Sequence, residues 1–158
     1  MKKTKNYEPL FWSIALPGFG QLLNKQYLKG IVFILAEFIV NVQSNFNVAI
    51  VHSFNGNIED AIHVTDYQWL MFYPCLYMFS LWDAHKDANS PSPYMYFPFA
   101  FGAYFVTVGL IYSHTFTLFG VLIGPVFLPM LFLLPGLAVG FIIRALLLRK
   151  SQQSEERF

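Results

Sequence analysis

The chain has 158 residues, of which 56% are hydrophobic and only 12% are charged, and its formal net charge is +1. A soluble domain usually has roughly 25% charged residues, so this chain has too few to cover its whole surface for water. A net charge this close to zero also gives no overall field that would favour nucleic-acid binding. The composition therefore indicates an integral membrane protein, and apolar runs of suitable length locate its spans.

The first apolar segment, residues 9–23, is short and is interrupted by Pro17 and Gly18. A straight helix of this length reaches only about 22 Å, which falls short of a hydrocarbon core roughly 30 Å thick. Lysines precede the segment, and Lys25 and Lys29 follow it at once. Because positive charge favours the cytoplasmic side, we expect a re-entrant or interfacial helix with both ends at that face. A short true span is the alternative.

Longer apolar segments predict transmembrane helices over residues 27–47, 67–84, 94–113 and 118–147. The connection at 48–66 has no Lys or Arg, so we expect a solvated outer loop there, with Glu59, His63 and Asp66 exposed. Residues 85–93 and the segment after Arg144 contain basic residues, which places them inside. Pro74 should kink the second span, because proline lacks the backbone donor that a helix interior uses.

The last apolar segment is longer than the hydrocarbon core, and it contains several Gly and Pro residues. These residues are expected to divide it into a short dipping piece and a kinked span, followed by a frayed tail from residue 151. The sequence thus predicts an all-α membrane protein, a single domain over residues 1–158. It has about four transmembrane helices plus an N-terminal re-entrant or interfacial helix. Both termini are expected on the cytoplasmic side of the cell membrane.

One acid, Glu37, lies about ten residues inside the first predicted span. A charged carboxylate near mid-membrane costs roughly 2.5 kcal/mol or more, so this side chain should face protein or water. Asn41 and Ser44 follow on the same helical face, with Gly30 behind them. One interpretation is a proton or cation relay, or a ligand for a lipid headgroup; the other is a hydrogen-bonding node that holds helices together. The candidate partners are Tyr73, Tyr77, Ser80 and Tyr104.

A second polar group, Asp83 to Asp87, lies where the second predicted span meets the cytoplasm. Asp83, His85 and Asp87 are of the types that coordinate metals, but this spacing is a weak metal signal. The other interpretation is a polar helix end in which Asp83 pairs with Lys25 or Lys29. We therefore predict no metal, cofactor or catalytic set, and keep Glu37, Asn41, Asp83 and His85 as candidate functional residues.

Residues 17–30 read PGFGQLLNKQYLKG, and Trp82-Asp83-Ala84 follows near the end of the second predicted span. This pattern resembles the TM2-domain superfamily of small membrane proteins, over roughly residues 11–87. The resemblance implies a glycine-rich first helix, a short turn and a second helix in a membrane, with little chemistry. Glycines permit close helix approach, and polar side chains near Pro17 satisfy the freed carbonyls. The motif residues are Pro17, Gly18, Gly20, Gln21, Asn24, Lys29 and Gly30.

We expect a non-enzymatic integral membrane protein that acts as a scaffold, assembly factor or accessory subunit. Its partners would be membrane lipids and either a second copy of itself or another membrane protein, without nucleic acid. A first alternative is a small oligomeric transporter or channel that uses Glu37 and Asn41. A second alternative is a membrane-embedded, lipid-acting enzyme, which requires Asp83, His85 and Glu37 to converge at the inner interface.

Overall fold

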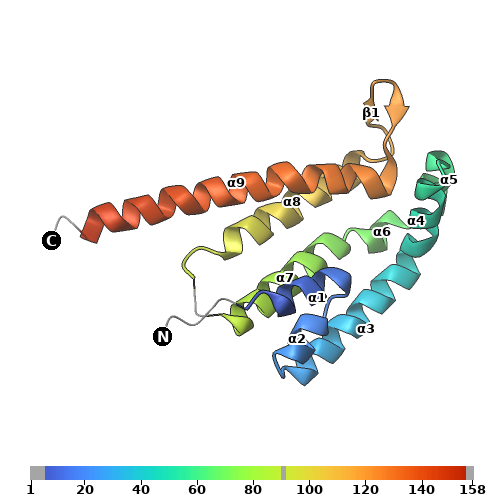
Figure 1. Ribbon diagram of the computed structural model, residues 1–158. Helices are drawn as coiled ribbons and strands as arrows, with labels where there is room; N and C mark the ends of the chain where they lie inside the picture. The colour runs from blue at the N-terminus through green and yellow to red at the C-terminus, as the bar shows by residue number, and fades with distance from the viewer. Residues whose placement is uncertain (1–5, 90–91, 156–158) are drawn as a thin grey trace.

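The computed structural model describes residues 6–89 and 92–155, and these are mostly helical (Figure 1). This confirms the predicted all-α class, apart from one small hairpin of two strands. The helices are α1 (Glu8–Ala15), α2 (Phe19–Leu23), α3 (Tyr27–Ser44), α4 (Phe46–Phe54), α5 (Ile58–Val64), α6 (Tyr67–Leu70), α7 (Tyr73–Ala88), α8 (Tyr96–Tyr112) and α9 (Gly124–Glu155). The strands are β1 (Thr117–Leu118) and β2 (Val121–Leu122).

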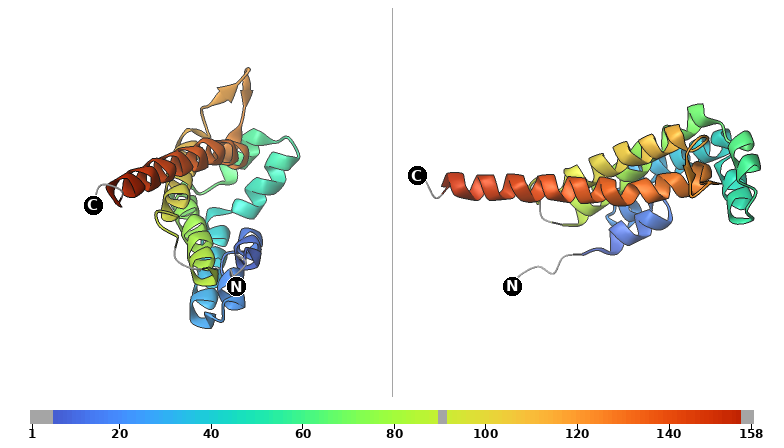
Figure 2. Two further views of the ribbon diagram at one scale, coloured as in Figure 1. Left: turned by 60° about the vertical axis from the view of Figure 1, so that its left-hand side comes forward. Right: turned by 90° about the horizontal axis from the view of Figure 1, so that it is seen from above.

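The longer helices α3, α7, α8 and α9 run between the two ends of an elongated molecule (Figures 1 and 2). Helices α8 and α9 form one antiparallel pair, and α1 and α2 pack against α7 and α3 in the other half. Two helical segments are long and apolar enough to cross a membrane, namely α3 and residues 124–153 of α9. Helix α8 is apolar but shorter.

The N-terminal apolar segment forms two short helices, α1 and α2, of 8 and 5 residues. At 1.5 Å per residue neither is long enough to cross the hydrocarbon core. The chain turns between them at Gly18, whose φ of 105° lies in the region that glycine adopts without steric cost. The segment is therefore not one straight helix.

The expected loop at 48–66 is wrong, because most of it is helical as α4 and α5. Asn45 has a positive φ of 55° and ends α3, so that α4 starts in a new direction. Ala49 and Ser53 are buried four residues apart, which is the spacing of one helix face. The absence of basic residues therefore gave no information about local structure.

Two predictions about prolines have different outcomes. The second span is interrupted as expected, because α6 ends at Leu70 and Pro74 lies in the first turn of α7, where a missing N–H leaves no bond unmade. The predicted division of residues 118–147 is wrong: α9 begins at Gly124 and continues through Pro129 and Pro135. The tail is also helical to Glu155, so fraying from residue 151 is not observed, and residues 156–158 lie outside the described part.

Backbone contacts at glycine and proline positions hold α8 close against α9. A Cβ added at Gly109 would lie 2.8 Å from Pro129 Cα, and one at Gly140 would lie 2.4 Å from Pro98 Cα. Gly136 similarly faces the backbone of Phe101. The glycines therefore let each helix approach the other at its proline positions, which is typical of membrane helix pairs.

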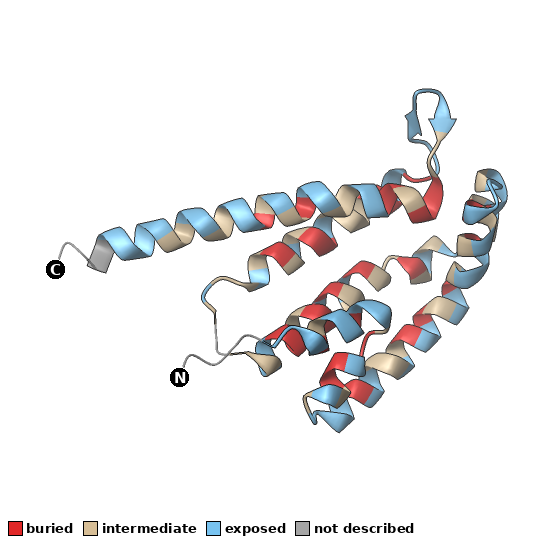
Figure 3. Cartoon of the chain, viewed as in Figure 1, coloured by how far each residue is buried: buried red, intermediate tan, exposed pale blue. Residues whose placement is uncertain are grey.

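The buried core is small, and it centres on Met78, Leu81 and Ala103, where α7 meets α8. Large apolar side chains remain exposed along the outer faces of α3 and α9 (Figure 3). On α3 these are Leu28, Ile31, Val32, Leu35, Phe38, Ile39 and Val42. Such wide apolar faces are typical of helices that contact lipid or another protein.

Candidate functional site

The glycines of the N-terminal motif bring three helices into backbone contact. A Cβ added at Gly18 would lie 2.5 Å from the carbonyl oxygen of Gly30, and one at Gly20 would lie 2.1 Å from that of Pro9. The Gly20 amide also donates to Ser13 Oγ at 3.2 Å. No side chain larger than hydrogen fits at these positions without displacing backbone. The motif therefore holds α1, α2 and the start of α3 as one tight unit.

Three polar side chains of the same motif reach across to α7, and we call their contacts the α7 clamp. Gln21 Nε2 donates to the Ser80 carbonyl at 2.8 Å and to Asp83 Oδ2 at 3.2 Å. Asn24 Nδ2 donates to the Ala84 carbonyl at 2.8 Å. Lys29 Nζ lies 3.0 Å from Asp83 Oδ1 and completes the clamp with a second carboxylate, that of Asp87.

The clamp joins the two sequence segments that carry the TM2 resemblance. Residues 17–30 supply the donors, and Asp83 and Ala84 of the Trp-Asp-Ala segment supply acceptors. Ala84 is also packed closely, because a Cβ added at Gly20 would lie 2.8 Å from Ala84 Cβ. The small and polar residues of the motif thus both have a structural role within this chain, because the small ones allow close packing and the polar ones bind α7.

The carboxylate of Asp83 is the most buried charge of the clamp. Its side chain is 8% exposed, whereas that of Lys29 is 44% exposed. Both Asp83 oxygens are occupied, one by the Lys29 ammonium and the other by the Gln21 amide. The charge of this buried carboxylate is compensated by its two donors. Removing one partner of a buried ion pair leaves the other charge uncompensated, which destabilises the fold.

The clamp contains the lysine pairing that the sequence suggested for the segment Asp83 to Asp87. Asp83 and Asp87 share Lys29, at 3.0 Å each, as the polar helix-end interpretation expected. His85 turns to a different side, where its ring stacks on Tyr7 with centroids 6.0 Å apart. Among the described residues, no group of three or more His, Cys, Asp or Glu side chains is placed to hold a metal ion.

Glu37 lies buried between α3 and α7. It lies near the start of α7, whereas the clamp holds the other end of that helix. Its Oε1 accepts a hydrogen bond of 3.0 Å from the Tyr73 hydroxyl, one of the candidate partners expected from the sequence. Its Oε2 is buried and has no hydrogen-bond partner within residues 6–89 and 92–155. Asn41, one turn further along, donates to Asn47 Oδ1 at 3.2 Å. Glu37 is thus held by α7 at one oxygen only.

Tyr73 and Tyr77 extend the Glu37 contact toward α1. Their rings stack with centroids 5.6 Å apart, and the Tyr77 hydroxyl donates to the Ile14 carbonyl. Tyr73 precedes Asp83 by ten residues, which corresponds to about 15 Å along α7. These contacts therefore do not gather Glu37 with Asp83 and His85 into one cluster at the end of α7 that holds the clamp.

The acidic residues expected in the outer connection are exposed, as predicted. Glu59 lies in the first turn of α5 with Asp60, whose carboxylate lies 3.9 Å from His52 Nδ1. His63 is exposed in the last turn of the same helix. Asp66 caps α6, because its Oδ1 accepts from the Gln68 amide at 2.9 Å. Of the predicted residues, Asp66 stabilises a helix end directly, and the others lie exposed in the end turns of α5.

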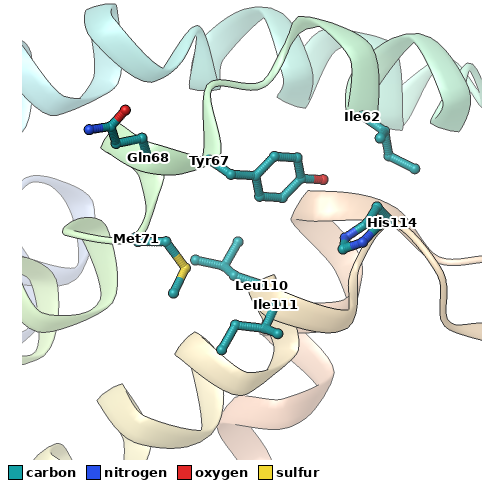
Figure 4. A pocket seen from close by; sticks show the side chains of 7 residues that line it. All are labelled: Ile62, Tyr67, Gln68, Met71, Leu110, Ile111 and His114. Carbon is teal, nitrogen blue, oxygen red and sulfur yellow. The ribbon is translucent and has the colours of Figure 1, made fainter.

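An open groove of 590 Å³ lies at the end of the molecule opposite the clamp (Figure 4). Its lining residues come from α5, α6, α8 and the turn after α8, and they are Ile62, Tyr67, Gln68, Met71, Leu110, Ile111 and His114. Ser113 Oγ donates to the Tyr67 hydroxyl at 3.1 Å. The lining is mostly apolar and brings together no nucleophile with a base. Because the residues are far apart in sequence, no local motif predicts this groove.

Comparisons of this chain with protein-family models, with curated proteins and with solved structures find no match. The contacts of the chain itself therefore carry the functional argument. The likeness of residues 17–30 and 82–84 to the TM2-domain superfamily remains an expectation from the sequence.

Proposed function

We propose that this chain is a non-enzymatic integral membrane protein that acts as a scaffold, assembly factor or accessory subunit. The observation that carries the proposal is the α7 clamp. Its donors Gln21, Asn24 and Lys29 all bind groups of the same chain. The most distinctive polar residues of the sequence thus stabilise a helix bundle, while broad apolar faces on α3 and α9 remain uncovered.

The distribution of charge supports a four-crossing topology for α3, α7, α8 and α9. Lys29, Lys86 and Arg144 lie at the end that holds the α7 clamp, whereas Glu59 and Asp66 lie at the opposite end. Residues 124–143 of α9 contain no charge, and at 1.5 Å per residue they extend about 30 Å, the thickness of a hydrocarbon core. By the positive-inside rule the clamp end faces the cytoplasm of a cell-membrane protein.

The apolar faces of α3 and α9 indicate how such a protein would work. Lipid covers them in a monomer, and a second copy or another membrane protein covers part of them in a complex. Crosslinking in native membranes, followed by gentle purification and mass spectrometry, tests this directly. We expect a stoichiometric membrane-protein partner; recovery of the monomer alone, with every crosslink inside one chain, would contradict a scaffold or accessory role.

Topology is expected to follow the charge distribution. In a Cys75→Ala background, Asn55→Cys between α4 and α5 should react with a membrane-impermeant maleimide on intact cells. Gln152→Cys, near the end of α9, should react only after the cells are opened. Both side chains are exposed, so accessibility within the fold does not differ between them. Labelling of both positions from outside would imply an even number of crossings between them, which would rule out the three proposed for α7, α8 and α9 and the proposed orientation.

A small oligomeric transporter is a second candidate, because Glu37 Oε2 is buried without a hydrogen-bond partner among the described residues. Glu37→Gln separates the two functions, since an amide keeps an oxygen acceptor for Tyr73 but cannot ionise. The scaffold proposal predicts unchanged abundance, thermal stability and partner recovery. A transporter predicts normal abundance with abolished proton or cation flux in proteoliposomes. Tyr73→Phe serves as the control for the hydrogen bond alone.

A further inference from the structure

A small hairpin between α8 and α9 projects away from the helices, to one side of α9 (Figures 1 and 2). Its two strands pair in antiparallel register, with Thr117 opposite Leu122 and Leu118 opposite Val121. Phe119 and Gly120 form the turn at the tip. The Phe119 side chain is 98% exposed, so it gains almost no packing from the rest of the chain.

The turn conformation makes the choice of phenylalanine unfavourable for folding alone. Phe119 has a φ of 51° and Gly120 a φ of 81°. Two positive φ values are the pattern of a type I′ turn, which favours Asn-Gly. A bulky side chain at positive φ is a genuine outlier, and such strain is concentrated at functional sites. Phe119 is thus both strained and exposed, which points to a contact outside the chain.

The surroundings of the tip determine the chemistry of that contact. Phe116, Leu118 and Val121 are also exposed, and residues 115–143 contain no charged side chain. The hairpin therefore presents an aromatic and aliphatic surface with no group for a charged partner. Its backbone is open at the outer edges of two-residue strands, so the hydrocarbon interior would leave polar groups unsatisfied. The membrane–water interface satisfies both requirements, because amphipathic and aromatic groups prefer it.

The position of the hairpin agrees with this interface. Strand β2 ends at Leu122, and the uncharged stretch of α9 starts two residues later at Gly124. If α9 crosses the membrane, a hairpin that projects to one side at its start lies at the end of the hydrocarbon core. Phe119 then extends sideways from the bundle over neighbouring lipids.

We propose that residues 117–122 form an interfacial anchor whose Phe119 inserts among the phospholipids of the outer leaflet. The proposal rests on the membrane-spanning role proposed above. It assigns to the hairpin a contact that fixes the depth and tilt of the α8–α9 pair, since both helices are joined directly to its ends.

Site-directed fluorescence in lipid nanodiscs tests the anchor on the full chain. In a Cys75→Ala background, Phe119→Cys is labelled with an environment-sensitive fluorophore, and phosphatidylcholines brominated near the headgroup or deep in the acyl chain act as quenchers. We expect a blue-shifted emission and loss of most fluorescence with the shallow quencher, with less loss from the deep one. Val121→Cys should be quenched in the same way, and adding Phe119→Asn should remove that quenching because the anchor is lost.

Two matched positions separate this inference from the membrane proposal itself. Leu35→Cys, exposed in the middle of α3, should be quenched by the deep bromines, and Asn55→Cys should respond only to aqueous iodide. If Leu35 is quenched but the Phe119 label responds to iodide, the anchor is wrong and the span stands. If the Phe119 label is shielded from iodide and from both lipids, a protein covers it and the anchor is also wrong. If the Leu35 label is not quenched by lipid and responds to iodide, the spanning proposal fails first.

Discussion

Replacement of Lys29 by Met should destabilise the protein by about 3 kcal/mol, because it leaves the buried Asp83 carboxylate without its cation. Breaking a buried pair by removing one partner costs roughly 3–5 kcal/mol. The lower end applies here, since the Lys29 side chain is 44% exposed and its charge is partly screened. Thermal unfolding of the purified protein in detergent, and its abundance in membranes, would both fall.

Two variants distinguish the clamp from a general effect of losing a surface lysine. Lys25→Met removes a neighbouring charge that makes no ion pair among the described residues, and it should leave stability within about 0.5 kcal/mol. Lys29→Met combined with Asp83→Asn should be less destabilised than the sum of the single variants, because the uncompensated charge is gone. Equal losses for Lys25→Met and Lys29→Met, or strict additivity in the double variant, would show that the clamp does not stabilise the fold.

The polar contacts of the motif were partly predictable from the sequence, because polar groups in an apolar segment must find partners. Lys29 pairs with Asp83, and Tyr73 binds Glu37, both among the expected partners. From the sequence, Lys25 and Lys29 are equivalent candidates for pairing with Asp83, since both follow α2 closely. The structure distinguishes them: Lys25 has a positive φ of 62° in the turn before α3, whereas Lys29 lies within α3, facing α7.

Other features depended on contacts between distant segments and had no local signal. The helices α4 and α5 were expected as a loop, because their lack of basic residues was interpreted as an outer connection. Continuity of α9 through Pro129 was missed because a proline alone does not show whether a helix ends; in the structure α9 continues through it and packs closely against Gly109. The hairpin before Gly124 was not predicted, because it lies in an apolar run whose hydropathy is typical of a membrane span.

The spacing of Gly136 and Gly140 is a packing signal that the sequence analysis also overlooked. Two glycines four residues apart lie on one helix face and allow another helix to approach closely. In the structure that face packs on α8 within the same chain, against Phe101 and Pro98. It therefore has an intramolecular use, which makes it a poor candidate for the surface that binds a partner and leaves the exposed faces of α3 and α9 for that role.

Adding one methyl group at Gly140 should consequently separate α8 from α9. The Cβ of an alanine would lie 2.4 Å from Pro98 Cα and 2.7 Å from the carbonyl oxygen of Phe97, both backbone atoms that no rotamer change can move. Overpacking of this kind typically costs 1–3 kcal/mol, and we expect about 3 kcal/mol for Gly140→Ala because the clash is with backbone. Denaturant or thermal unfolding in detergent measures the loss.

Gly102→Ala is the matched control on the facing helix, because it adds the same methyl group and only the atoms that this group contacts differ. Its Cβ would lie 3.3 Å from Leu133 Cδ1 and 3.5 Å from Met78 Sδ, which are the ends of flexible side chains. These ends can shift by a few tenths of an ångström, and alanine also favours a helix over glycine by about 0.8–1 kcal/mol. Gly102→Ala should therefore be close to neutral. If both substitutions destabilise the protein equally, helix separation at the Pro98 contact is not the cause of the lost stability. The close approach of α8 and α9 would then not depend on backbone contact at Gly140.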